Sequence, residues 1–91
     1  MTASYHRHPE LRLTSVEDEG IALHLDTRRY FSVNESGLLI LEALRDSRSA
    51  DDLVGMLLQR YDAAPAHARS SVLQFLASCQ AGQLVLRHDS A

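Results

Sequence analysis

The chain has no lysine, no tryptophan and only one cysteine. The lack of lysine and of further cysteines limits the partners and the cellular compartment that we expect. All nine basic residues are arginines, and against twelve acidic residues they leave a formal net charge of −3. Proteins that grip nucleic-acid phosphates usually present a strongly basic surface, so this composition does not favour a nucleic-acid partner. Cys79 alone cannot form an internal disulfide, which agrees with a reducing compartment.

Long hydrophobic runs are also missing. The longest, from Leu38 to Leu41, is far shorter than the roughly 20 apolar residues that cross a bilayer as a helix. Residues 1–9 are polar where a secretory signal would be apolar. We therefore expect a cytoplasmic protein with no membrane partner. With 91 residues, 45% of them hydrophobic and 23% charged, the chain is expected to form one globular domain.

The first third of the chain predicts a flexible arm and then an antiparallel sheet. Residues 1–10 carry little apolar material, so we expect a flexible N-terminal arm outside the core. Residues 11–16 alternate apolar and polar side chains, which predicts a first strand, and an acidic turn at 17–20 follows. A second strand is predicted over 21–25, and a third over 30–33 after a turn at 26–29.

Alternation in the second strand also predicts its two faces. Ile21, Leu23 and Leu25 point to one face, while Ala22 and His24 point to the other. This two-residue period is typical of a half-buried strand. On this interpretation His24 lies on the outer face of the strand.

Three helices are predicted after the strands. Asn34 is a good N-cap for a helix over 35–46, and Ser49 with Asp52 forms a start like a capping box for a helix over 50–60. Pro65 fits the first turn of a third helix, and Gly82 is placed as its C-terminal cap. An apolar stripe along this helix comprises Ala68, Val72, Phe75, Leu76 and Cys79.

These elements predict an α+β fold like a winged helix-turn-helix, with a three-stranded antiparallel sheet followed by three helices. The domain is expected to span 11–86. Residues 84–86 fold back onto the core, and 87–91 form a C-terminal tail.

Candidate catalytic groups are scattered, so we expect no enzyme activity, no metal and no cofactor. His6 and His8 lie in the predicted arm, and His24, His67 and His88 are on separate elements without the spacing of a metal site. The four glycines are too far apart for a loop that cradles phosphate.

The edge of the sheet is the strongest functional candidate among the residues. If the strands pair in sequence order, the third strand leaves a row of N–H and C=O groups without a neighbouring strand. Two interpretations remain open from the chemistry: the third helix or the tail shields this edge, or an extended peptide adds there as another strand. A winged-helix regulator of DNA is a further alternative, but the third helix offers only Arg69 to a phosphate.

Residues 26–44, which join the second turn, the third strand and the first helix, resemble the centre of the PqqD-like family. Members of this family are the recognition elements of ribosomally made, post-translationally modified peptides. The resemblance extends through 49–53, Tyr61 and Asp62, Phe75 and Leu76, and 82–84. It implies a non-catalytic adaptor that binds the leader segment of a precursor peptide as an added strand, in the cleft between the third strand and the third helix.

Members that serve the quinone cofactor PQQ tend to carry a hydrophobic-Tyr-Pro-Glu-Gly stretch at the second turn, where this chain has 25–29. The chain looks closer to the separate leader-binding proteins of lasso-peptide pathways, which hand the precursor to a leader peptidase. The alternatives are a PQQ-type or other radical-SAM-linked peptide chaperone, a DNA-binding regulator, and a small subunit that only stabilises a larger enzyme.

Carried onto this sequence, the resemblance implies a binding site on the third strand and the third helix. The strand would supply backbone pairing, and the helix would supply an apolar wall and, in Arg69, a partner for a leader carboxylate. Leu73 and Arg69 are expected to face the cleft because they lie off the most apolar line of the helix. Val72, Phe75 and Leu76 form a stripe at helical spacing, which is more often plain core. The implied leader-binding residues are Arg29, Tyr30, Phe31, Ser32, Val33, Arg69, Val72, Leu73 and Leu76.

Overall fold

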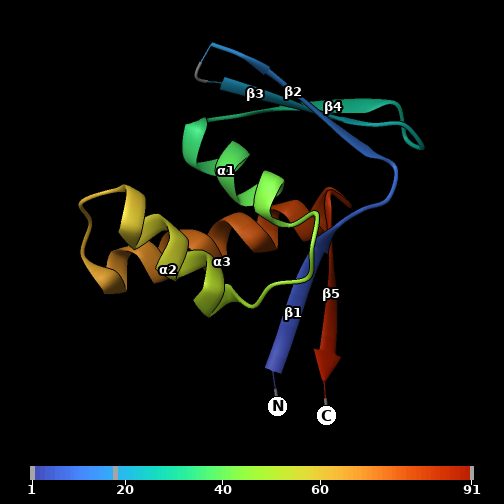
Figure 1. Cartoon of the computed structure of the whole chain (residues 1–91). Helices are drawn as coiled ribbons and strands as arrows, with labels where there is room; N and C mark the ends of the chain where they lie inside the picture. The colour runs from blue at the N-terminus through green and yellow to red at the C-terminus, as the bar shows by residue number, and fades with distance from the viewer. Residues whose placement is uncertain (1, 18, 91) are drawn as a thin grey trace.

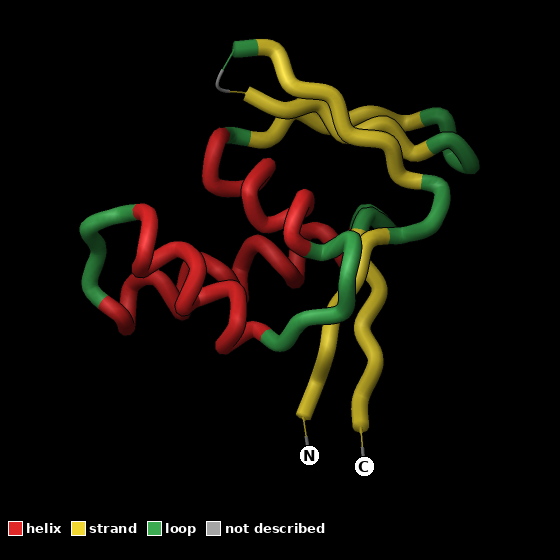
Figure 2. Tube along the Cα trace, in the orientation of Figure 1, coloured by secondary structure: helices red, strands yellow, loops and turns green. Residues whose placement is uncertain are grey.

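A computed structural model describes residues 2–17 and 19–90 (Figure 1). The chain forms two antiparallel sheets and three helices (Figure 2). In chain order the elements are β1 (Thr2–Arg7), β2 (Leu11–Val16), β3 (Glu19–His24), β4 (Arg29–Val33), α1 (Glu35–Ala43), α2 (Ala50–Arg60), α3 (Pro65–Ala81) and β5 (Val85–Ser90). The predicted α+β class, with a three-stranded sheet and three helices, is confirmed.

The three-stranded sheet has the order β2-β3-β4, as sequential pairing predicts. Its register places Leu13 opposite Ala22 in the first pair, and Ala22 opposite Phe31 in the second. Two non-glycine residues, Glu17 and Arg28, adopt left-handed backbone angles with φ of 60° and 62° in the connecting turns. Arg28 donates its N–H to the carbonyl of His24, which closes the second turn.

The prediction of a flexible arm over 1–10 is wrong for its strand residues. β1 pairs along its length with β5, which also takes up most of the predicted C-terminal tail. Tyr5 is buried and exchanges backbone hydrogen bonds with Arg48 in the loop between α1 and α2, at 2.8 and 3.0 Å. The local sequence gave little sign of this strand, because the partners that stabilise it lie some 40 and 80 residues further along the chain.

The alternation predicted for the second strand is correct, but its faces are inverted. Ala22 and His24 are fully buried on the face of the sheet that the helices cover, whereas Ile21 and Leu23 are each 38% exposed on the outer face. The cause is the close approach of α1: a Cβ on Gly20 would lie 2.7 Å from Leu38 Cδ1. At Gly20, where the helix and the sheet come so near, no larger side chain fits without a shift, and Ile21 and Leu23 point to the opposite face.

The helix starts follow the predicted caps. Asn34 accepts a hydrogen bond from the N–H of Gly37, and Ser49 and Asp52 form a complete capping box at α2. Helix α1 ends at Ala43, three residues before its predicted end. Gly82 is the C-cap of α3, but its φ of −87° is ordinary, and the left-handed position is held by Gln83.

The core gathers beneath the three-stranded sheet, between the helices. Leu41, Leu44 and Leu53 of the α1–α2 region are fully buried there, and Val72 and Leu76 of α3 lie beside them. Leu84 and Val85 are also buried, which confirms that the chain folds back after α3. None of the described helices is long and apolar enough to span a membrane.

Candidate functional site

One side of β4 is open. β4 lies at the end of the order β2-β3-β4, and among residues 2–17 and 19–90 no other strand pairs with it. In an antiparallel ladder every second residue of an edge strand directs its N–H and C=O away from its neighbour. β4 therefore offers a short row of backbone donors and acceptors on its free side.

Helix α3 passes below this strand. In the second half of the helix, Phe75 approaches Gly37, where a Cβ would lie 3.0 Å from Phe75 Cε1. At its end, a Cβ on Gly82 would lie 3.5 Å from Phe31 Cζ. The flank of α3 that carries Phe75 and leads to Gly82 thus contacts α1 at Gly37 and β4 at Phe31.

A hollow of about 240 Å³ opens on this flank, at the end of β4. Apolar side chains from all three helices form much of its wall, and the Asn34 cap and two serines give it a polar rim. Its lining residues are Asn34, Ser36, Gly37, Ile40, Leu57, Ser71, Val72 and Phe75. Because the hollow adjoins the open strand, a peptide paired with β4 could insert an apolar side chain into the hollow.

The strand residues implied as binding residues lie together on β4. Phe31 and Val33 are partly buried on the inner face and pack against the core, whereas Tyr30 and Ser32 point outward. The guanidinium of Arg29 stands 6.0 Å from the centre of the Phe31 ring, within reach of a cation–π contact.

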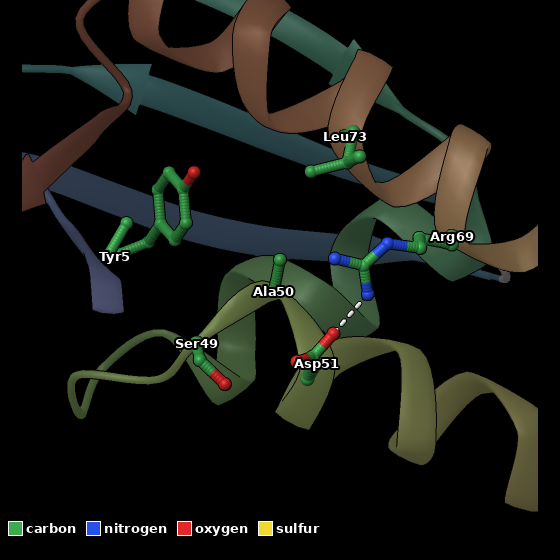
Figure 3. A pocket seen from close by; sticks show the side chains of 7 residues that line it. Tyr5, Ser49, Ala50, Asp51, Arg69 and Leu73 are labelled. Carbon is green, nitrogen blue, oxygen red and sulfur yellow. Dashed lines mark hydrogen bonds and ion pairs between the residues drawn. The ribbon is translucent and has the colours of Figure 1, made fainter. Parts of the chain in front are cut away.

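Of the four helix residues implied as binding residues, Val72 lines the hollow beside this strand, and Arg69, Leu73 and Leu76 do not. Val72 and Leu76 are fully buried in the core. Arg69 and Leu73 lie on the opposite flank of α3, where they line a second hollow with Tyr5 and the start of α2 (Figure 3). The guanidinium of Arg69 is paired with the carboxylate of Asp51.

Sequence reasoning assigned Phe75 to the core and passed over Ser71 and Gly37. Positions 71, 75, 78 and 82 share one flank of a helix, and the spacing alone could have grouped them. The information missing from the pattern was which flank faces β4. On the other flank, Ala3 and Tyr5 of β1 line the hollow with Arg69 and Leu73.

Two titratable side chains away from the hollow, Cys79 and His24, are buried. Burial raises the pKa of the Cys79 thiol to about 11, so little reactive thiolate forms near neutral pH. His24 is buried, not on the outer face as predicted: its Nδ1 accepts a hydrogen bond from Thr27 N–H at 3.4 Å, and its ring lies 4.4 Å from that of His8. Among the described residues, no three His, Cys, Asp or Glu side chains gather as a metal site.

Comparison with known families supports what this geometry suggests, a small module with an open sheet edge beside a helix. Residues 19–85 match the family described as "Coenzyme PQQ synthesis protein D (PqqD)". The chain belongs to the PqqD family. The match covers β3, β4 and all three helices but not β1 or β2.

Two solved structures share the fold. One is described as "TbiB1 in Complex with the TbiA(beta) Leader Peptide", with a TM-score of 0.79 over 88% of this chain and 93% of that one. The other, "Lasso peptide synthetase B1 complexed with the leader peptide", has a TM-score of 0.77 over 90% and 96%. Each is 20% identical to this chain. A search of curated proteins found no match.

Proposed function

We propose that this protein binds the leader segment of a ribosomally made precursor peptide as a strand added to β4. The observation that carries the proposal is the open side of β4 beside the hollow lined by Phe75. Strand addition takes affinity from backbone hydrogen bonds and specificity from pockets that receive alternate side chains. The two similar structures, each described as a complex with a leader peptide, support this assignment.

The binding surface we propose differs in part from the one the sequence implied. Backbone pairing is supplied by 29–33, and the inner wall is supplied by Phe31 together with Phe75 and Ser71. Arg69 and Leu73 are left out because they face the hollow beside Tyr5. Val72 and Leu76 support the wall from within the core.

The protein acts as an adaptor and not as a catalyst in this proposal. Holding the leader raises the effective concentration of the precursor near a separate processing enzyme. A lasso-peptide leader peptidase is the partner that the resemblance favours. The expected affinity is roughly micromolar to tens of nanomolar, or about −8 to −10 kcal/mol.

The family description favours a second candidate, which is leader binding in a PQQ-type pathway served by a radical-SAM enzyme. The binding step would be the same, and only the enzyme that receives the precursor would differ. Residues 25–29 depart from the hydrophobic-Tyr-Pro-Glu-Gly stretch of PQQ members. We therefore place the lasso pathway first.

A titration with a synthetic leader peptide tests the proposal. The peptide should be the leader segment of a lasso-peptide precursor, with a scrambled peptide of the same composition as control. We expect saturable heat on calorimetric titration, and slower amide hydrogen exchange in 29–33 when the peptide is bound. Absence of heat at high micromolar peptide, or protection confined to other strands, contradicts the proposal.

A further inference from the structure

The outer face of the three-stranded sheet exposes several large apolar side chains among polar ones, although it is turned away from the core. An antiparallel sheet with one covered face commonly presents polar residues on the other. Here the outer face exposes Ile21 and Leu23 at 38% each, Leu25 at 41% and Tyr30 at 74%. The register sets Leu23 directly opposite Tyr30, so these side chains form a continuous apolar row that reaches the open strand.

Tyr30 is the point where this row meets the proposed binding edge. The outer-face side chains of β4 are those of Tyr30 and Ser32, because 29, 31 and 33 share the inner face. On one side Tyr30 has Leu23 as its cross-strand neighbour. On its other side, among the described residues, no strand supplies a second neighbour.

A strand that adds to β4 has to fill that position. Successive side chains of a strand point to opposite faces, so only half of those on an added peptide can reach the hollow beside Phe75. The other half lie on the outer face, where directly opposite residues have Cβ atoms about 4.5–5.5 Å apart. One of them must lie next to Tyr30 and another next to Ser32.

We propose that the leader peptide is recognised on both of its faces, and that the residue it places beside Tyr30 is aromatic or large aliphatic. This inference rests on the proposed function and names the class of peptide that the site selects. Such a residue would cover the exposed ring of Tyr30 and extend the apolar row by one strand. The position beside Ser32 gains no comparable contact and accepts polar residues.

The peptide is therefore the occupant that we assign to the Tyr30 end of the apolar row. Pairing at β4 brings a peptide side chain to Tyr30 without any further surface. Leu25 lies at the other end of the row, beyond the end of β3, in a hollow of about 410 Å³ with Leu23 and Arg28. Because it follows β3, and β4 separates β3 from the open edge, Leu25 is not the direct cross-strand neighbour of an added strand.

This difference between Tyr30 and Leu25 supplies a matched pair of variants. Tyr30→Thr removes the ring but keeps a residue that suits a strand, and Leu25→Thr makes a similar change at the far end of the row. Both side chains are exposed, so both variants should keep the circular dichroism spectrum and melting temperature of the parent. We expect Tyr30→Thr to weaken binding of the synthetic leader by roughly fivefold, as for loss of a good cross-strand pair, and Leu25→Thr to leave it unchanged.

A serine scan of the peptide completes the test. In the parent protein the losses should fall into two alternating sets along the peptide. One position of the outward set should lose its effect in Tyr30→Thr, because the contact is already missing. If the loss of affinity from Tyr30→Thr simply adds to the loss from each serine substitution, at every position of the peptide, the inference is overturned.

The failure of this inference can be told apart from failure of the proposed function. If the parent binds the leader and Tyr30→Thr binds it equally well, the inference is wrong and strand addition stands. If Tyr30→Thr instead dissociates a homodimer or abolishes binding to the purified processing enzyme at unchanged leader affinity, the row belongs to that protein and the inference is likewise overturned. If the parent binds no leader, the proposed function fails, and the inference with it.

Discussion

The two flanks of helix α3 border hollows of the same volume, about 240 Å³ each, yet their surroundings differ. On the flank of Phe75, the hollow adjoins a strand whose free side has no partner. On the flank of Leu73, β1 already lies alongside, joined to β5 and tied to the loop at Arg48. The comparison indicates that peptide binding depends on the free side of β4, which has no neighbouring strand, and not on the volume of the hollow.

The two flanks of α3 also differ in charge. The guanidinium of Arg69 is already paired with Asp51 on the β1 flank, so it has a partner within the protein. Serine, glycine and phenylalanine form much of the β4 flank, and none of them is charged. An apolar side chain could enter there without removing a charge from water.

Removing the support of the closed flank should have the largest effect. Tyr5→Ala deletes a buried ring between β1 and the helices, and we expect it to lower the free energy of unfolding by about 3 kcal/mol. Chemical denaturation with urea measures this loss. Ser4→Ala on the same strand is the control and should change stability by less than about 0.5 kcal/mol. Equal, small effects would mean that residues 2–7 are a loose arm in solution.

Filling the open flank should affect binding next. Ser71→Trp places a large ring at the mouth of the hollow without deleting a core side chain, and we expect leader affinity to fall at least tenfold, or about 1.4 kcal/mol. Ser70→Trp is the matched control, because the neighbouring serine is exposed and does not line the hollow. Titration of both variants with the synthetic leader measures the two affinities. Similar affinities for the two would move the peptide away from this flank.

Much of the fold could be predicted because its signals are local. Asn34, Ser49 and Pro65 mark helix starts through the hydrogen bonds or dihedral angles of neighbouring residues, and all three helices begin where these residues predict. The three strands of the larger sheet were predicted to within two residues at each end, because alternation is visible within a few positions.

The remaining features depend on partners distant in sequence. Alternation cannot say which face is buried, and the close packing of Leu38 on Gly20 reverses the choice that hydrophobicity favours. The strand at Tyr5 depends on β5 and on Arg48. Because the sequence pattern does not predict β1, it gives no reason to separate Leu73 from the residues on the other flank of α3.

Altering the closed flank should have the smallest effect on binding. Leu73→Glu places a charge on a side chain that is 42% exposed and lies beside Tyr5, away from β4. We expect leader affinity to stay within about twofold of the parent, because the change reaches neither the open strand nor the hollow at Phe75. Arg69→Ala should behave alike, since the pair with Asp51 is solvent-exposed and such pairs contribute about 0–1 kcal/mol to stability. A tenfold loss in either variant, with the melting temperature unchanged, would place the peptide on the β1 flank and reverse the comparison.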